Sequence, residues 1–558
     1  MGFILSASSL HGAVEPELRG VWMHATQIKT PAETRACVER IAKTGFNAVF
    51  VLVWYWGGEA YFKSSYCPMG RGVQPGHDPL GALVAACRRR GIQVHAWFVN
   101  GAYGAKEINH VLDRHPDWAV DTGGGGELWY DLGKPEVRAF ERDLMLECLR
   151  KYAIDGLHFD YIRYGPRYCF CRYCRREFSK RFGLSAGVDS WGRTFPLYLT
   201  VGANPVGRPD SARVLLRFRR GLPAAALNRL GKGEALLLNW HAEDLTPPAV
   251  SVFVQKVLAR WKVSPGRVFL LNTRENRALY GERFRARAFR AFERLGFKPK
   301  YASEDRIGKL QPGDLVVLPA VYSLSSRTAA ELESFMKKGG YLLFMDGPVR
   351  SMQLASVRRM LGMKRSSRYF HGEVAIEPVG KNELVPVSEK PIPISVQKDL
   401  ERKWASFRAW GVTQLVREVY RGAKKIRPSS SVSAAVFTPL ASARRVFQDW
   451  PGWLREGIVD FVVPMAYTSS TVALAAQVAE WKTVDPELRR IIPGLSIYLR
   501  KNGKTIPRPP SLVLAQRGIC KKAGARGNVY FSLHYLSEEL ISAFRKGPYL
   551  RKAPPYIP

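Results

Sequence analysis

The sequence predicts an α/β protein in which a (β/α)8 TIM barrel is interrupted after its fourth strand by an inserted doubly wound α/β domain. From Leu18 to about residue 170, short β-branched strands alternate with amphipathic helices, as expected of parallel strands joined by crossover helices. The same alternation returns from about residue 400 onward, and a separate series fills the region between. The predicted boundaries are 16–200 for the first half-barrel, 205–390 for the inserted domain and 395–545 for the second half-barrel.

The first half-barrel supplies four predicted strands. They are GVWMHA (20–25), FNAVFVLVWYW (46–56), IQVHAWFVN (92–100) and IDGLHFDYIR (154–163). The second is apolar almost throughout, which is typical of a strand buried on both faces. Helices are expected between the strands, with Gly45 capping the C-terminus of the first and Pro135 in the first turn of the third. Four such repeats are half of a TIM barrel.

The second half-barrel supplies the other four strands after a long amphipathic helix at 403–428. They are SVSAAVFT (431–438), VDFVVPMAYT (459–468), RIIPGLSIYL (490–499) and GNVYFSLHYL (527–536). In the inserted region, five strands with short connections predict an open doubly wound sheet. They are 233–240, 266–274, 298–305, 314–320 and 339–347. This region has no glycine-rich nucleotide-binding motif, so no organic cofactor is expected.

Composition limits the partners and the compartment. No apolar run is long enough to span a bilayer, so no membrane span is expected. The segment GFILSASSLHGAVEP has the apolar stretch of a signal peptide but no basic start, which leaves export and a cytoplasmic location equally open. The net charge of +37 favours anionic partners. Its basic residues are scattered and form no familiar nucleic-acid-binding motif, so nucleic acid is not expected.

Asp160 is the leading candidate for a functional side chain. It ends the fourth predicted strand, and functional groups of a β/α barrel gather where the strands end. Because side chains alternate along a strand, His158 lies on the same face as Asp160. Capping of a helix or pairing with Arg163 is the structural alternative for this carboxylate.

Several segments resemble the glycosyl hydrolase-like 10 family. They include RGVWMHATQ, GFNAVFVLV, DPLGALVAACRRRGIQVHAWF, IDGLHFDYIR, QDWPGWLREGIVDFVVPMAYT and GNVYFSLHYL. The resemblance covers most of residues 18–170 and 400–540 in order and leaves the inserted region outside. It implies a TIM barrel related to glycoside hydrolases and a carbohydrate substrate.

Cleavage of a glycosidic bond normally takes two carboxyl groups. Asp160 supplies one, and the strand tips from the fifth to the seventh carry no other acid. Glu59, Asp449 and Glu538 are candidates for the second, with Asp449 and Glu59 preferred because both lie in family-like segments. A substrate whose own acetamido group attacks would need only one enzymic acid and an orienting group.

Aromatic faces pack against sugar rings, and polar tips bind hydroxyl groups. Packing inside the barrel is the alternative for each aromatic residue. The predicted sugar-facing residues are His24, His95, Trp97, Asn100, His158, Tyr161, Arg163, Met465, Tyr467 and His534.

Three cysteines follow the fourth strand in CFCRYC: Cys169, Cys171 and Cys174. Three thiols this close can hold a structural zinc ion, with Cys67 as a fourth ligand on the same barrel face. Reduced thiols or a disulfide are the alternatives. The segment also resembles family 42 beta-galactosidases, which implies a structural zinc and a flavodoxin-like trimerization domain, and hence a possible homo-oligomer. The Asn-Glu pair of that family is absent, because this strand ends Phe159-Asp160.

The sequence therefore predicts a glycosidase that acts on a polysaccharide or glycan through Asp160, with an acidic glycan favoured by the positive charge. A non-catalytic carbohydrate-binding or scaffold protein is the alternative, favoured by the scarcity of acids at the strand tips. Binding of an anionic polymer through charge alone is a third hypothesis, and its strong dependence on salt would distinguish it.

Overall fold

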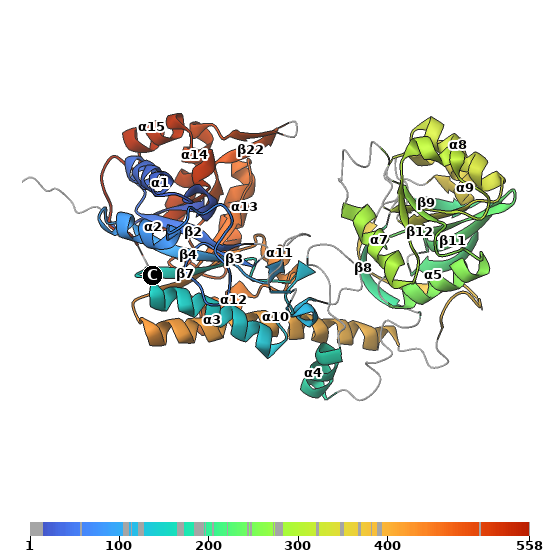
Figure 1. Cartoon of the computed structure of the whole chain (residues 1–558), viewed down its shortest axis with the longest axis horizontal. Helices are drawn as coiled ribbons and strands as arrows, with labels where there is room; N and C mark the ends of the chain where they lie inside the picture. Colours follow the sequence, from blue (N-terminus) through green and yellow to red (C-terminus); the bar gives the residue numbers. More distant parts are fainter. Residues whose placement is uncertain are drawn as a thin grey trace, which may run out of the picture. The chain divides into compact units, whose positions relative to one another are not determined.

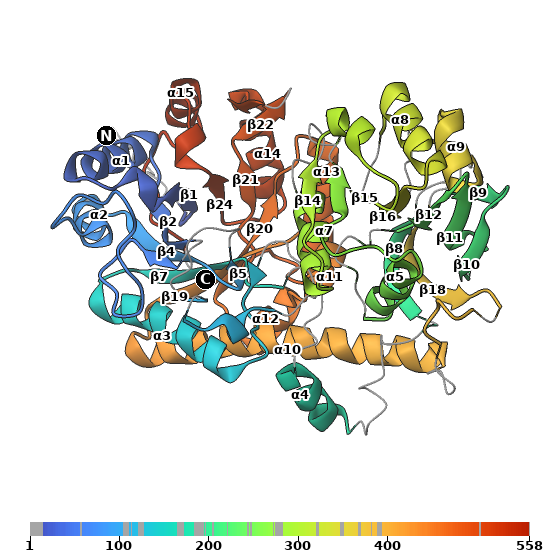
Figure 2. The ribbon, with the colours of Figure 1, turned by 45° about the vertical axis from the view of Figure 1, so that its right-hand side comes forward.

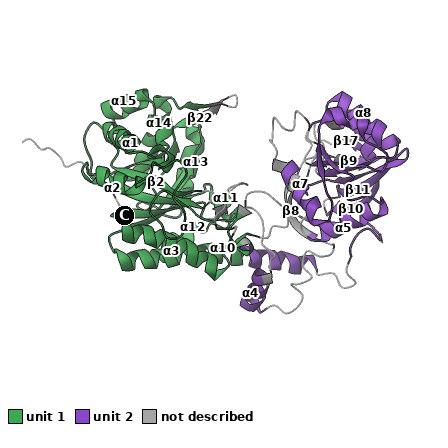
Figure 3. Cartoon of the chain, in the orientation of Figure 1, with its two compact units in different colours: residues 1–120, 127–167, 406–558 green, residues 121–126, 168–405 purple. Residues whose placement is uncertain are grey.

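The structure is a computed structural model. It describes residues 15–55, 58–103, 111–112, 114–120, 128–164, 172–183, 195, 197–203, 206–219, 221–240, 242, 245, 248–271, 273, 283–319, 323–345, 351–365, 370–380, 382–387, 393–501 and 504–556. The chain forms two compact units (Figure 3). Residues 1–120, 127–167 and 406–558 make the first, and residues 121–126 and 168–405 make the second. The domain boundaries drawn from the sequence stay predictions.

The first unit is a closed barrel of eight parallel strands, as predicted. Each strand pairs with the next, and the last pairs with the first to close the ring. In ring order the strands are β1 (Leu18–His24), β2 (Ala48–Tyr55), β4 (Gln93–Val99), β7 (Gly156–Asp160), β19 (Ser431–Val436), β20 (Phe461–Ala466), β21 (Gly494–Ser496) and β24 (Gly527–Phe531). All eight predicted strands are therefore confirmed.

Helices surround this ring (Figures 1 and 2). They are α1 (Pro31–Thr44), α2 (Pro79–Arg88), α3 (Pro135–Lys151), α10 (Ile394–Ile426), α11 (Leu440–Arg445), α12 (Trp450–Glu456), α13 (Thr471–Lys482), α14 (Pro510–Lys522) and α15 (Glu538–Lys546). The predicted ends of α1 and α3 are confirmed, since Gly45 caps α1 with a φ of 88° and Pro135 begins α3.

The long helix α10 begins earlier than the sequence predicted and runs beside α3 in both views. Gly422 makes the close approach possible, because a Cβ there would lie 2.4 Å from Cδ1 of Leu146. Farther along, Arg408 of α10 forms a fully buried ion pair with Asp131, at 3.0 Å. The Tyr164 hydroxyl donates to the same carboxylate at 3.1 Å. These bonds tie α10 to the segments that follow β4 and β7.

The second unit contains a nine-stranded mixed sheet. Its parallel part, in spatial order, is β14 (Lys300–Ala302), β13 (Val268–Leu271), β15 (Leu315–Pro319), β16 (Tyr341–Met345) and β12 (Gly233–Leu238). These are the five predicted strands. Helices α5 (Pro248–Arg260) and α7 (Arg283–Arg294) pack in one hydrophobic cluster, and α8 (Ser326–Lys337) and α9 (Ala355–Leu361) in another. Helices thus cover both faces of the parallel part.

Four antiparallel strands extend this sheet and were not predicted: β11 (Pro223–Leu230), β10 (Arg213–Phe218), β18 (Phe370–Pro378) and β8 (Leu197–Ala203). The first parallel strand along the chain, β12, lies at the end of the parallel part, next to β11. This order differs from the 2-1-3-4-5 order of flavodoxin, so the flavodoxin-like assignment stays a prediction. Within the part of the chain that is described, no helix has both the length and the apolar character needed to cross a membrane.

Candidate active site

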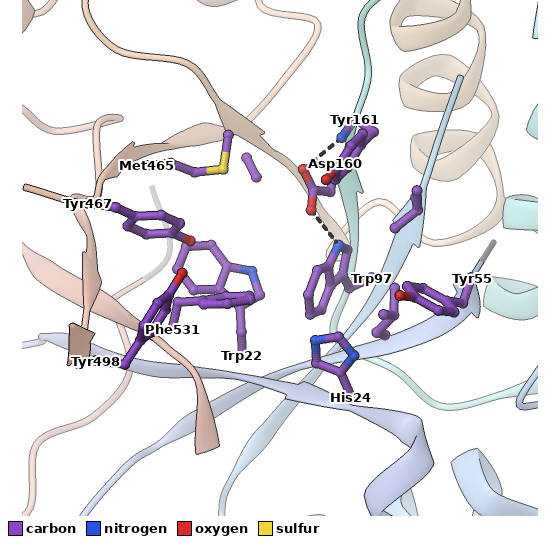
Figure 4. Close-up of a pocket in the computed structure, with 13 residues that line it drawn as sticks. Trp22, His24, Tyr55, Trp97, Asp160, Tyr161, Met465, Tyr467, Tyr498 and Phe531 are labelled. Atoms are coloured by element: carbon purple, nitrogen blue, oxygen red, sulfur yellow. Dashed lines mark hydrogen bonds between the residues drawn. The ribbon is translucent and has the colours of Figure 1, made fainter. Parts of the chain in front are cut away.

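A pocket of about 250 Å³ opens at the carboxyl ends of the barrel strands (Figure 4). This volume is close to the lower end of the usual range for ligand sites, roughly 300–1,000 Å³. It is large enough for a group the size of one six-membered ring. Its lining residues are Trp22, His24, Leu52, Tyr55, Trp97, Val99, Asp160, Tyr161, Ala435, Met465, Tyr467, Tyr498 and Phe531. Six of the residues named from the sequence are among them: His24, Trp97, Asp160, Tyr161, Met465 and Tyr467.

Asp160 is the only carboxyl group among these lining residues. Its side chain is buried, and its Oδ2 accepts a hydrogen bond from Trp97 Nε1 at 3.2 Å. Its Oδ1 accepts from the backbone N–H of Tyr161 at 2.7 Å. Burial raises the pKa of Asp160 to about 6, against the opposing effects of the Arg163 charge and these two hydrogen bonds. Asp160 can therefore hold a proton in mildly acidic solution and release it in a reaction.

The backbone makes a sharp turn directly after Asp160. Tyr161 adopts a left-handed conformation with a φ of 51°, which is uncommon for a bulky residue. This turn brings its own N–H back to the Asp160 carboxylate. The neighbouring strand turns at Gly101, where a Cβ would lie 2.8 Å from the carbonyl oxygen of Arg163. The backbone turns at Tyr161 and Gly101 thus position the Asp160 carboxylate. Unusual backbone conformations of this kind are common at functional sites.

Aromatic side chains form most of the pocket wall. Trp22 packs against Trp97 and Phe531, with ring centroids 6.5 Å and 5.9 Å apart. Tyr467 and Tyr498 lie across the cavity from Asp160 and Trp97, with their hydroxyl groups toward the cavity (Figure 4). Burial, together with the nearby Asp160, raises the pKa of Tyr467 well above its usual value. The pocket therefore offers apolar ring faces and neutral hydroxyl donors, the combination that suits a sugar.

The histidines occupy two different levels. His24 lines the pocket, packed edge-on against Trp97 with centroids 5.5 Å apart, and burial and His534 lower its pKa. His95 and His158 are fully buried and do not line the pocket. His95 stacks on Phe50 at 4.5 Å, and burial lowers its pKa to about 3. Both buried histidines lie in the barrel interior outside the pocket lining, and their sugar-facing assignments stay predictions.

Three further predicted sugar-facing residues lie outside the pocket lining. Asn100 is buried and donates to Glu141 of α3 at 3.0 Å, because the alternation of β4 turns Val99 inward and Asn100 outward. Arg163 is held between the rings of Tyr161 and Phe437, at 4.1 Å and 4.2 Å from their centroids. His534 is exposed, in a short helix after β24.

The candidates for a second carboxylate also lie outside the pocket lining. Glu59 pairs with Arg71 at 2.6 Å, and Asp449 caps α12 by accepting from Gly452 N at 3.2 Å. Glu538 pairs with Lys43 at 2.9 Å. Their catalytic assignments stay predictions.

Some lining residues were not named from the sequence. They are Trp22, Leu52, Tyr55, Val99, Ala435, Tyr498 and Phe531. The alternation of β1 and β24 gives a usable signal for two of them, since Trp22 shares a face with His24 and Phe531 ends its strand. Tyr498 follows β21 in a hairpin strand, β22 (Tyr498–Lys501), whose position the strand pattern alone does not specify.

The predicted zinc ligands are only partly described. Cys169 and Cys171 lie outside the described residues. Cys67 is a buried free thiol of the first unit, and burial raises its pKa to about 12. Cys174 is buried on α4 (Arg172–Phe182) in the second unit. Among the described residues, no three His, Cys, Asp or Glu side chains cluster as metal ligands would.

The closed β/α barrel, with an acid in an aromatic pocket at its strand ends, is a TIM barrel whose candidate site lies where functional sites of this fold are found. The chain belongs to the family described as Glycosyl hydrolase-like 10, whose family model matches residues 17–174 and 377–509, more than half of the chain. The family expected from the sequence is thus confirmed. The similarity of the cysteine segment to family 42 beta-galactosidases is not shown.

Two curated relatives match parts of the chain. Glycosyl hydrolase YngK of Bacillus subtilis (strain 168) is 26% identical over 219 residues, which are 34% of this chain and 42% of that protein. Glycosyl hydrolase DigH of Escherichia coli (strain K12) is 31% identical over 144 residues, 22% of this chain and 32% of that protein. The match thus spans less than half the length of either relative.

Solved structures give weaker likenesses. A beta-galactosidase from Bacillus circulans sp. alkalophilus is 11% identical, with a TM-score of 0.43 over 93% of this chain and 50% of that chain. The catalytic domain of a beta-amylase from Paenibacillus polymyxa is 8% identical, with a TM-score of 0.40 over 96% of this chain and 98% of that chain. The fold assignment therefore stands on the strand topology.

Proposed function

We propose that the chain is a glycoside hydrolase that acts on a polysaccharide or glycan, with Asp160 as its general acid. The observation that carries the proposal is a single buried carboxyl group in an aromatic pocket at the strand ends, with a pKa raised to about 6. Burial of one carboxyl group in an apolar site is the usual way to keep it protonated for this chemistry. Membership of the glycosyl hydrolase-like family supports the same activity.

In the proposed reaction, Asp160 donates its proton to the glycosidic oxygen while the bond to the anomeric carbon breaks. A water molecule then supplies the new hydroxyl group on that carbon and gives up its other proton. The positive charge that develops on the sugar needs a second group, either a carboxylate or an acetamido group of the substrate. Glu59 and Asp449 remain the predicted carboxylates, although both are engaged outside the pocket lining. Attack by the substrate needs only an orienting group, and the Tyr467 and Tyr498 hydroxyls face Asp160 across the cavity.

The test is a hydrolysis screen with p-nitrophenyl glycosides and unlabelled oligosaccharides, including 2-acetamido sugars. We expect turnover of at least one of them, with kcat/KM falling as the pH rises through about 6, because the acid must be protonated. Proton NMR of the first product anomer then distinguishes retention from inversion. A rate that rises with pH through this range would contradict the general-acid role.

A non-catalytic carbohydrate-binding or scaffold protein is the second candidate function. It is favoured by the presence of only one carboxyl group among the residues that line the pocket. Calorimetry together with the hydrolysis screen distinguishes the two, since a binding protein would bind oligosaccharides but release no reducing ends.

A structural zinc ion held by Cys169, Cys171, Cys174 and Cys67 is a separate proposal, based on the spacing of the first three. We expect elemental analysis to find about one zinc per chain and a chelator to lower the unfolding temperature. Cys171→Ser is expected to remove the metal, while Cys520→Ser, at a buried thiol of α14, serves as the control. A metal-free purified chain would refute the site.

Self-association through a flavodoxin-like inserted domain and a preference for anionic glycans also stay predictions.

A further inference from the structure

A series of hydrogen bonds runs through the barrel interior from Trp22, a residue that lines the pocket. Trp22 of β1 lines the pocket, and its indole Nε1 lies 3.2 Å from Nε2 of His158 in β7. On the other side of the imidazole, Nδ1 lies 2.8 Å from the hydroxyl oxygen of Ser433 in β19. Both His158 and Ser433 are fully buried and neither lines the pocket. These hydrogen bonds thus cross the barrel from β1 to β19, directly beneath the pocket.

The chemistry of the donors determines which ring nitrogen of His158 carries the proton. An indole N–H can only donate, so His158 Nε2 must be the acceptor and carry no proton. The proton of a neutral imidazole then sits on Nδ1 and is donated to Ser433. Burial and the neighbouring His95 lower the pKa of His158 well below its usual value, so the ring stays neutral. Both ring nitrogens of His158 therefore form hydrogen bonds inside the barrel, one with Trp22 and one with Ser433.

The opposite edge of Trp22 is equally constrained. A Cβ at Gly494 of β21 would lie 2.7 Å from Cη2 of the Trp22 ring, so only glycine leaves room for this ring position. The ring also packs against Phe50 at 6.2 Å and Phe531 at 5.9 Å. The indole is held by a hydrogen bond at its nitrogen and by steric limits at its far edge.

We propose that His158 is a positioning residue that sets the depth of the pocket: it holds Trp22 as the floor, and Gly494 provides the space in which that floor lies. The inference rests on the proposed function, since the floor acts on a bound sugar. His158 itself contacts no substrate. Its removal would leave the buried Trp22 N–H without an acceptor, which is costly enough to shift the ring.

The test uses the full-length chain labelled with 5-fluorotryptophan, in which Trp22→Phe identifies the Trp22 resonance among the fourteen. His158→Leu and Gly494→Ala are expected to displace this resonance. His158→Gln should preserve it, because its amide can accept from Trp22 and donate to Ser433. Gly518→Ala is the matched glycine control, since a Cβ there meets nothing within 4 Å. An unmoved Trp22 resonance in His158→Leu overturns the proposal.

Kinetics on the p-nitrophenyl glycoside that the wild type hydrolyses fastest provide the second measurement. We expect KM to rise by roughly 10-fold in His158→Leu, because a displaced Trp22 ring loses about 1.4 kcal/mol of contact with the bound sugar. The change in kcat should be smaller, and KM should recover in His158→Gln. A folded His158→Leu with unchanged KM overturns the proposal. A wild type that hydrolyses no glycoside overturns the proposed function instead, and the fluorine spectra still decide whether His158 positions Trp22.

Discussion

Replacing Asp160 with asparagine is expected to reduce kcat/KM by about 10²- to 10⁴-fold, the usual contribution of a positioned general acid. Asparagine keeps the shape of the side chain, and its one carbonyl oxygen can still accept from either Tyr161 or Trp97. It has no proton of suitable acidity to give. The measurement is steady-state hydrolysis at pH 5, below the pKa of about 6, where the acid is mostly protonated.

Loss of activity in this variant should not reflect loss of the fold. Burial raises the pKa of Asp160 from 3.8 to about 6, so the stability this carboxyl contributes when protonated is lost as the pH rises through that window. The neutral asparagine avoids this loss, and Asp160→Asn should unfold at the same or a higher temperature at pH 8.

Asp143→Asn is the matched control, because Asp143 lies on α3 beside Arg142 and outside the pocket lining. It should retain activity within about 2-fold of the wild type, as surface substitutions usually do. Glu59→Gln and Asp449→Asn in the same assay test the two predicted second carboxylates. If Asp160→Asn keeps more than a tenth of the wild-type rate, the acid role of Asp160 is wrong.

The barrel and its acid follow from local rules that the sequence displays. Strands buried on both faces, separated by capped helices, specify a parallel barrel, and the strand-end rule locates Asp160 in the pocket. The sequence did not predict the antiparallel strands β11, β10, β18 and β8. They join the parallel sheet through long-range pairing, which no local pattern records.

Depth along a strand and backbone turns explain why some predicted site residues lie outside the pocket lining. The alternation groups His158 with Asp160, but His158 comes two residues earlier, about 6.6 Å deeper along the strand, and lies outside the pocket lining. Arg163 comes after the left-handed turn at Tyr161, which ends the alternation. A strand period specifies the face of a side chain, whereas its depth in a pocket depends on packing from other strands, here on Trp22.

Replacing Glu141 with glutamine is expected to stabilise the barrel at pH 8 and to change it little at pH 5. Glu141 is fully buried on α3 and accepts from Gly101 N at 2.9 Å and from the Asn100 amide at 3.0 Å. Burial raises its pKa from 4.5 to about 7, against these two hydrogen bonds. Stability is therefore fully present below pH 4.5 and is lost as the pH rises to about 7, by an amount on the order of 3 kcal/mol.

Glutamine is uncharged at every pH and can still accept from Gly101. Its amide can also donate to Asn100 Oδ1, which has no hydrogen-bond partner among the described residues, once the Asn100 amide turns over. Urea unfolding followed by tryptophan fluorescence should therefore show a gain of about 2–3 kcal/mol at pH 8 and near-equality with the wild type at pH 5.

Glu147, two turns along the same helix, is the matched control with the opposite sign. Burial alone would raise its pKa, but hydrogen bonds from Lys151, Ser65 and Ser64 lower it. Its contribution is present at neutral pH and lost as the pH falls, so Glu147→Gln should destabilise the protein at pH 8. A Glu141→Gln effect that is the same at both pH values would show that the Glu141 carboxyl is not forced to ionise within the fold. In that case, protonation of Glu141 in mild acid would not stabilise its contacts with Asn100 and Gly101.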